Sequence, residues 1–348
     1  MKKILFASSA LVAVAAAGTA QASEPIQLSV GGYMEQWAGF ADEDNTAAGG
    51  RKNAFQSDTE VHFSGSTTLD NGIEVGADIQ FEGESSSGDQ VDEQYLYING
   101  GFGRIEMGKN DSAADAMGIT APSVGPVGVN DGDMSNWVDA YLIDTVRSSG
   151  DQKRVTYYTP VLGGFRAGLS YADQNASNNN DTVSTGINIV SGGLEYRADL
   201  DGVALALSAV GENAGEGNWY GFGTNVGFGN FTVGASYGHT EDDYGVNERN
   251  NNFGLNDGGN ELDAFDIGVS YAMDAASVSL SYGYEDVDGE GDISAIDLGL
   301  NYALGAGVAW KSSIFWFDQK ADSNAVNPQD ITKDNDGYGL VTGLALSF

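Results

Sequence analysis

One acidic run in the sequence has the residue types of a calcium-binding loop. Across residues 286–297, Asp286, Asp288 and Glu290 take positions 1, 3 and 5 of the EF-hand pattern, with glycine at position 6 and isoleucine at position 8. Position 12 is Asp297, which reaches less far than the glutamate that usually chelates the ion there. Because the flanking residues alternate as strands do, we interpret the run as the tip of an outer hairpin. Its candidate ligands for Ca²⁺ or Mg²⁺ are Asp286, Asp288, Glu290 and Asp292, and no other cofactor is expected.

Two further motifs have reactive residue types without the surroundings that the chemistry needs. Gly221-Phe222-Gly223 is similar to a dinucleotide-binding turn, but no strand–turn–helix pattern surrounds it. His62 lies among carboxylates, yet no nucleophile or orienting group can be placed beside it. The chain has no cysteine and only two histidines, which excludes the usual zinc sites. These patterns do not predict an enzyme.

The overall charge limits the partners. The net charge is −35, with 15 Lys and Arg against 50 Asp and Glu. Phosphate contacts need Lys and Arg, so nucleic acid is excluded as a partner. Such a balance favours cations, at a surface or in a channel. A soluble acidic or salt-adapted protein would have the same charge, so the fold must be argued from other features.

The first 22 residues have the pattern of a secretory signal peptide. Lys2 and Lys3 precede an apolar stretch over residues 4–17, and Ala20-Gln21-Ala22 supplies the small-x-small cleavage motif. We predict that residues 1–22 are removed and that the mature chain leaves the cytoplasm as one domain, residues 23–348.

Alternation with a period of two is the main structural signal after residue 22. In the segment 277–284, Val278, Leu280 and Tyr282 share one face, and small or polar residues share the other. A soluble β-sandwich would also alternate. Aromatic residues at the ends of the apolar faces, as in the girdles of membrane barrels, favour a barrel in a membrane: Trp37, Tyr171, Tyr271, Tyr302, Trp316 and Tyr338.

Turns and loops indicate how the strands connect. Short turns with Asp, Asn or Gly, such as Asp201-Gly202, alternate with long loops rich in Asp, Asn and Gly, among which we include 286–292. We count sixteen strands, from about 28–40 to 338–348. An even number lets the last strand pair with the first. The sequence therefore predicts an all-β fold, a closed antiparallel transmembrane β-barrel of 16 strands. One insertion of about 40 residues, 110–151, shows no alternation, and a loop of that length is expected to be functional.

Four segments resemble alphaproteobacterial general outer-membrane porins. Three of them look like the third to fifth strands and the loop that follows: Gly72–Ala77, Gly101–Gly108 and Asp111–Ala114. The fourth, Leu344–Phe348, is similar to the final porin strand with its terminal Phe. The resemblance implies that the long third loop, at 110–151, folds into the lumen and constricts it. It also implies a homotrimer in the outer membrane, in contact with lipid and lipopolysaccharide.

The resemblance further implies an electric field across the constriction, between loop acids and wall bases. The loop acids are Asp111, Asp115, Asp131, Asp133, Asp139 and Asp144. The candidate bases are Lys153, Arg154, Arg166, Arg197 and Lys311. The second to fourth strands depart from the family pattern, since their inward residues include Asp58, Glu60, His62, Glu74 and Asp78 but no Arg or Lys. We therefore expect a diffusion pore for ions and small hydrophilic solutes that prefers cations. A substrate-selective channel and a surface adhesin or structural barrel remain the alternatives.

Overall fold

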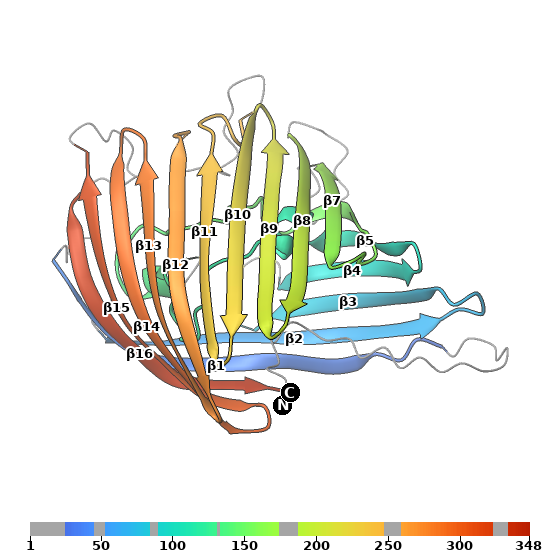
Figure 1. The fold of residues 1–348 in the computed structure, drawn as a ribbon, viewed down its shortest axis with the longest axis horizontal. Helices are drawn as coiled ribbons and strands as arrows, with labels where there is room; N and C mark the ends of the chain where they lie inside the picture. The colour runs from blue at the N-terminus through green and yellow to red at the C-terminus, as the bar shows by residue number, and fades with distance from the viewer. Residues whose placement is uncertain are drawn as a thin grey trace.

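The computed structural model of the chain describes residues 25–44, 53–83, 90–130, 133–173, 187–246, 259–322 and 333–348. Sixteen strands form one closed barrel, in which each strand pairs antiparallel with its sequence neighbours and β1 pairs with β16 (Figure 1). The predicted fold is confirmed. The predicted signal peptide, residues 1–22, lies outside the described residues and stays a prediction. In the described ranges, no helix is both long enough and apolar enough to cross a membrane.

The elements follow one another with few interruptions. The strands are β1 (Ser29–Glu43), β2 (Asn53–Thr68), β3 (Glu74–Glu82), β4 (Val91–Gly100), β5 (Gly103–Asn110), β6 (Gln152–Tyr158), β7 (Phe165–Asp173), β8 (Asn188–Leu200), β9 (Val203–Ala214), β10 (Gly217–Phe228), β11 (Phe231–Thr240), β12 (Leu262–Met273), β13 (Ala276–Val287), β14 (Gly291–Gly305), β15 (Val308–Ala321) and β16 (Asn335–Ser347). Between β5 and β6 lie a short helix, α1 (Ala113–Met117), and a 3₁₀ helix, η1 (Asp133–Asn136).

The burial of the strands distinguishes a membrane barrel from a soluble sandwich. On β13, Leu280 is 50% exposed whereas Ser279 and Ser281 are each 2% exposed. The apolar side chains thus face outward and the small polar ones inward, and the same holds for Leu298 and Ile314 on the next strands. An apolar outer face is stable only against lipid or another protein. The outer surface therefore matches the hydrocarbon region of a bilayer.

Trp37 does not lie on this outer face, so its predicted place in an aromatic girdle is wrong. It is 6% exposed and packs inside the barrel with Trp137 and Val341. Its partner across the β1–β16 ladder is Gly343, where a Cβ would approach the Trp37 ring to 2.5 Å. Alternation along β1 places Trp37 on the inward face with Glu35, and the glycine leaves room there for the large ring. Trp316 and Tyr338, by contrast, are exposed on the outer face as predicted.

The hairpins end as their sequences indicate, with one exception. Asp201 and Gly202 both have positive φ, 54° and 91°, which is the geometry of a tight type I′ turn. The predicted loop at 286–292 is shorter than expected, because β13 runs to Val287 and β14 begins at Gly291. The start of β1 and the C-terminal residue lie together at the end of the barrel with the short turns, where the Gly32 amide donates to the Phe348 carbonyl at 3.0 Å.

Candidate pore-lining site

The segment between β5 and β6, residues 111–151, lies on the inner face of the barrel and is called the inner loop below. Its described residues make two passes along the wall, 111–130 and 133–137 on the way out from β5, and 138–151 on the return. Irregular backbone at membrane depth has to find hydrogen-bond partners inside the protein. The partners here are mostly side chains of the inner wall.

The first pass begins with the short helix α1. The Ser112 hydroxyl caps its N-terminus by accepting the Asp115 amide at 3.1 Å, and the Ala113 amide donates to Ser170 Oγ on β7 at 2.7 Å. The apolar side of α1, including Met117, is buried against Ile189, Trp219 and their neighbours. Capping and burial together fix the start of the loop on β7–β9.

The extended part of the first pass is held by three wall strands. The Ala121 amide donates to the Asp266 carboxylate on β12, at 3.2 Å to either oxygen. Farther on, the Val124 amide donates to Ser279 Oγ at 3.0 Å and the Val127 amide to Ser313 Oγ at 3.2 Å. These three inward side chains thus supply hydrogen-bond acceptors to loop amides that a regular strand or helix would have satisfied with its own backbone.

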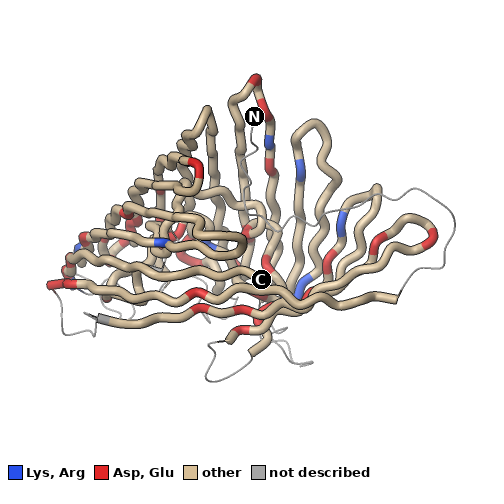
Figure 2. Tube along the Cα trace, turned by 90° about the horizontal axis from the view of Figure 1, so that it is seen from below, with Lys and Arg blue, Asp and Glu red and all other residues tan. Residues whose placement is uncertain are grey.

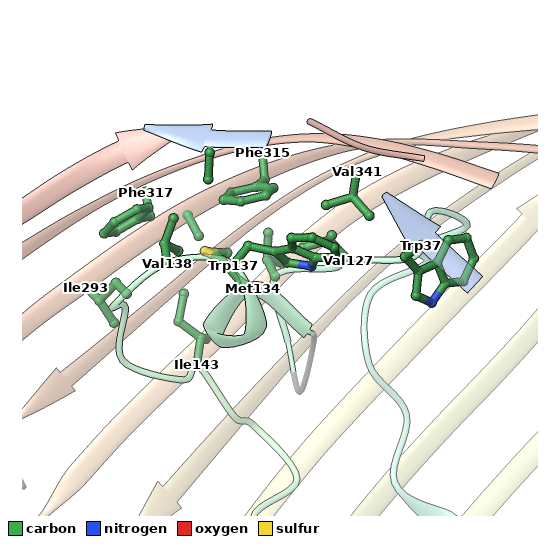
Figure 3. Close-up of a cluster of buried hydrophobic side chains, with 13 residues drawn as sticks. Trp37, Val127, Met134, Trp137, Val138, Ile143, Ile293, Phe315, Phe317 and Val341 are labelled. Carbon is green, nitrogen blue, oxygen red and sulfur yellow. The ribbon is translucent and has the colours of Figure 1, made fainter. Parts of the chain in front are cut away.

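The tip of the loop is packed by apolar side chains (Figure 3). Met134 in the 3₁₀ helix η1 and Trp137 just after it belong to one buried cluster with Phe315 and Phe317 on β15. A Cβ at Gly39 would lie 2.1 Å from the Trp137 ring, so only glycine admits the indole against β1. Burying each large apolar side chain contributes about 1.5–3 kcal/mol, so this cluster is a strong attachment point.

The return pass is held by buried glutamates. Its backbone amides donate to wall carboxylates at three places: Asp139 to Glu43 at 2.9 Å, Asp144 to Glu285 at 2.8 Å, and Ser149 to Glu212 at 3.1 Å. The Arg147 guanidinium also donates to Glu285, at 2.7 Å. Hydrogen bonds to ionised groups are stronger than neutral ones. Several wall acids therefore hold the loop and do not line open water.

The structure places the predicted loop acids in different environments. Asp111 and Asp115 are half-buried near the start of the loop. Asp139 is exposed, with a carboxylate oxygen 3.8 Å from Lys333 Nζ, and Asp144 accepts the amide of residue 146 at 2.8 Å. Asp131 lies outside the described residues, and the side chain of Asp133 is likewise not described. The four acids whose side chains are described, Asp111, Asp115, Asp139 and Asp144, are spread along the loop.

Among the predicted wall bases, Lys153 does not face the lumen, and this part of the prediction is wrong. It shares its face of β6 with the exposed Val155 and Tyr157. Adjacent strand residues point to opposite sides, so Lys153 and Arg154 cannot both face inward. Arg154 does face inward, but it is only 3% exposed and donates to Ser149 Oγ and the Gly150 carbonyl. These hydrogen bonds hold the end of the inner loop against β6.

The other predicted bases are paired with acids on the inner wall. Arg166 lies 3.2 Å from Glu195 and Arg197 also pairs with Glu195. Arg104, which is not among the predicted bases, pairs with Glu106 at 2.5 Å on β5. These pairs form a basic region on β5–β8. Lys311 is separate from it and pairs with Glu35 at 3.1 Å.

The inner faces of β1–β4 form the acidic side. The Tyr33 hydroxyl donates to Glu60 at 2.8 Å and lies 3.2 Å from Asp58 Oδ1. His62 Nε2 lies 2.7 Å from Glu60. Glu74 and Asp78 continue this face on β3, where both are half-buried. Along the whole barrel, Asp and Glu are more frequent than Lys and Arg (Figure 2).

A second acidic group lies where the inner loop leaves β5. The carboxylate oxygens of Glu93, Asp111 and Asp151 lie within 4.8 Å of one another. Burial, together with the neighbouring carboxylates Asp111 and Asp92, raises the pKa of Asp151 to about 7. Lys109, 3.9 Å away, offsets this rise only in part.

This raised pKa predicts how Asp151 affects stability. The folded pKa, about 7, lies above the unfolded value of about 3.9, so the folded state binds the proton more tightly. Stability should be unaffected by this group below about pH 4, and should fall as the pH rises from about 4 to 7. Asp151→Asn should flatten that decline in thermal unfolding measured between pH 4 and 8. An unchanged pH profile would contradict the assignment, and Asp139→Asn, at an exposed position, is the control.

The EF-hand-like run does not form a compact ligand set. Asp286 and Asp292 lie opposite each other in the register of the β13–β14 hairpin, and both side chains are on the outer faces of their strands. Glu290 is 4% exposed and accepts a hydrogen bond from Asn260. The hairpin thus leaves Asp286 and Asp292 on the outer face and buries Glu290, whereas an EF-hand loop would wrap all of these acids around one ion. In the described ranges, groups of three close ligands occur elsewhere: His239, Glu261 and Asp263; Glu60, Glu82 and Asp92; Glu93, Asp111 and Asp151. A Ca²⁺ or Mg²⁺ ion at Asp286, Asp288, Glu290 and Asp292 stays a prediction.

Comparison with known proteins identifies relatives of the same architecture. A porin from Rhodobacter capsulatus is 33% identical over 124 residues, a match that covers 34% of this chain and 38% of that protein. The fold is similar to an anion-selective porin from Comamonas acidovorans, with a TM-score of 0.66 and 16% identity over 93% of this chain and 100% of the other. It is also similar to a mutant of Rh. blastica porin, with a TM-score of 0.61 and 17% identity over 92% and 100%. At such identities, the two solved structures show a shared fold only.

The family follows from the match over most of the sequence. Residues 7–322 match the Gram-negative porins. The closed barrel of sixteen strands, with its apolar outer face and polar inner face, agrees with that match. The chain therefore belongs to the Gram-negative porin family, whose members are outer-membrane channels and not enzymes.

Proposed function

We propose that the protein is a general diffusion pore for ions and small hydrophilic solutes, and that it prefers cations. The carrying observation is the inner face of β1–β4, which bears Glu35, Asp58, Glu60, Glu74 and Asp78. Strands β1–β4 contain no Lys or Arg at all. A water-filled passage lined by one sign of charge concentrates the opposite ion.

The inner loop explains why the proposed pore would admit only small solutes. It is attached to the wall by backbone hydrogen bonds on both passes and by the apolar cluster at its tip. A loop held in this way occupies part of the lumen, and the passage left beside it lies along the acidic face of β1–β4. Arg104, Arg166 and Arg197 form a basic region on the adjoining strands β5–β8, although Glu106 and Glu195 partly neutralise it.

The same proposal extends to the assembly and surroundings. We infer a homotrimer in contact with lipid and lipopolysaccharide, as in the family. The exposed apolar side chains on the outer face, such as Phe55, Leu96 and Met107, supply surface that a bilayer or a neighbouring copy would cover.

Planar-bilayer recording of the purified full-length protein tests the proposal. Insertion should give ohmic conductance steps, in groups of three for a trimer. In a salt gradient the reversal potential should report a preference for K⁺ over Cl⁻. Steps with the opposite sign of selectivity would refute the cation preference alone. Membranes that stay silent despite folded protein would refute the pore and favour an adhesin or structural barrel.

A further inference from the structure

A cavity of about 400 Å³ lies between the inner loop and the wall of β10–β13. Its lining comes from the loop and from four strands: Thr120, Ala121, Pro122, Ser123, Val124, Val129 and Asn130 on one side, and Asn225, Thr232, Asp266, Ser270 and Ser281 on the other. Ser123 is exposed, and Thr120 and Asn130 are half-buried, so the cavity opens to the lumen. Its volume falls within the range of small-molecule sites, about 300–1,000 Å³.

The wall side of the cavity offers hydroxyl and amide groups. Ser281 is 2% exposed, and its hydroxyl has no hydrogen-bond partner within the described residues. The Asn225 amide nitrogen donates to the Thr120 carbonyl at 3.1 Å, but its buried oxygen has no partner there. A buried polar group without a partner is costly, so these two groups favour a polar occupant.

The one charged group in the lining is already committed to the protein. Asp266 is 1% exposed, and its carboxylate accepts the Ala121 amide, the Asn130 side-chain amide, and both the backbone amide and hydroxyl of Ser236. Those bonds use the acceptor capacity of a carboxylate, which has about four lone-pair sites. The cavity also lacks Lys, Arg and aromatic residues. Its free groups therefore suit neither an anion nor a cation in particular.

The loop side of the cavity is more apolar. Pro122, Val124 and Val129 face hydroxyl-bearing residues of the wall across it. A sugar ring has the matching character, with hydroxyl groups that both donate and accept and with C–H surface between them. Serine, threonine and asparagine likewise both donate and accept.

From this geometry we propose that the cavity is a binding notch for neutral polyhydroxylated solutes of monosaccharide size. The notch rests on the proposed pore function, because solute reaches it through the lumen. It adds to simple diffusion a brief residence beside the constriction, set by hydroxyl and amide contacts and not by an aromatic track.

Single-channel recording with D-glucose tests the notch. Glucose should add saturable current noise, beyond the fall in conductance that excluded volume produces. An ethylene glycol oligomer of matched mass, with hydroxyls only at its ends, should lower the conductance without that noise. In the double variant Thr232→Val/Ser270→Ala, the half-saturating glucose concentration should rise roughly three- to tenfold, as expected for the loss of one or two hydrogen bonds.

The control is Ser208→Ala, which removes a hydroxyl from the inner face of β9 outside the cavity. It should keep the glucose response of the natural protein, and unchanged ion conductance in every variant shows that the barrel is folded. Wild-type steps without glucose-induced noise, or noise that the double variant leaves unchanged, would overturn the notch and leave the pore intact. Absence of any steps would overturn the pore function itself, and the notch with it.

Discussion

Replacing Glu285 by alanine should release the return pass of the inner loop and raise the single-channel conductance. Glu285 is fully buried, and it accepts both the Asp144 amide at 2.8 Å and the Arg147 guanidinium at 2.7 Å. Breaking a buried ion pair from one side costs about 3–5 kcal/mol, because the remaining charge stays buried. The open-channel current should become larger and noisier, and a protease should cleave the released loop.

Two further variants separate this effect from general damage. Arg147→Met in the Glu285→Ala background removes the stranded charge and should restore part of the protease resistance. Glu35→Ala breaks a half-buried pair with Lys311, for which a loss of at most about 1 kcal/mol is expected, and it should leave the loop resistant. If Glu285→Ala kept the natural conductance and resistance, the buried glutamates would not be what holds the return pass.

Neutralising the acidic face of β2 and β3 should abolish most of the cation preference. The variant is Asp58→Asn/Glu60→Gln/Asp78→Asn, which changes charge with little change in shape. One unit charge about 4 Å from an ion in water is worth about 1 kcal/mol, roughly a fivefold change in local ion concentration. The ratio of K⁺ to Cl⁻ permeability, taken from the reversal potential, should therefore fall on the order of fivefold or more. The difference should shrink at high salt.

A matched variant removes the same number of charges outside the lumen. Asp70, Asp201 and Asp274 are exposed residues in the short turns, and changing all three to asparagine should leave the permeability ratio nearly unchanged. Asparagine also tolerates the positive φ at position 201. Equal losses of selectivity in the two triple variants would mean that net charge, and not the acidic inner face, sets the preference.

The barrel could be predicted from the sequence because its signals are local. Alternation along each strand, as at Leu280 and Ser281, is an effect of successive residues, and turn residues such as Asp201 mark the ends. The same alternation places Lys153 on the outer face, because it is adjacent to the inward Arg154. Trp37 was misassigned because a large aromatic was expected on the outside, while Gly343 across the ladder provides space inside.

The attachment of the inner loop could not be predicted in the same way. Alternation places Asp266 and Glu285 on the inner face, but it does not tell a carboxylate that faces water from one that accepts a loop amide. That distinction depends on contacts between residues up to 186 positions apart on the first pass, as for Val127 and Ser313. The loop itself has no periodicity to read. Its acids were visible in the sequence, and their partners were not.

The contacts at the tip of the inner loop connect the first and last strands of the barrel. Glu43, on the first strand, accepts both the Asp139 amide and the side-chain amide of Asn335, on the last strand, each at 2.9 Å. Asn335 also donates to the Asp139 carbonyl at 2.8 Å. This three-way junction can be completed only after β1 and β16 have met, the contact of greatest sequence separation and hence among the slowest to form. This part of the loop attachment therefore requires a closed barrel, whereas the packing of the tip against Phe315 and Phe317 on β15 does not.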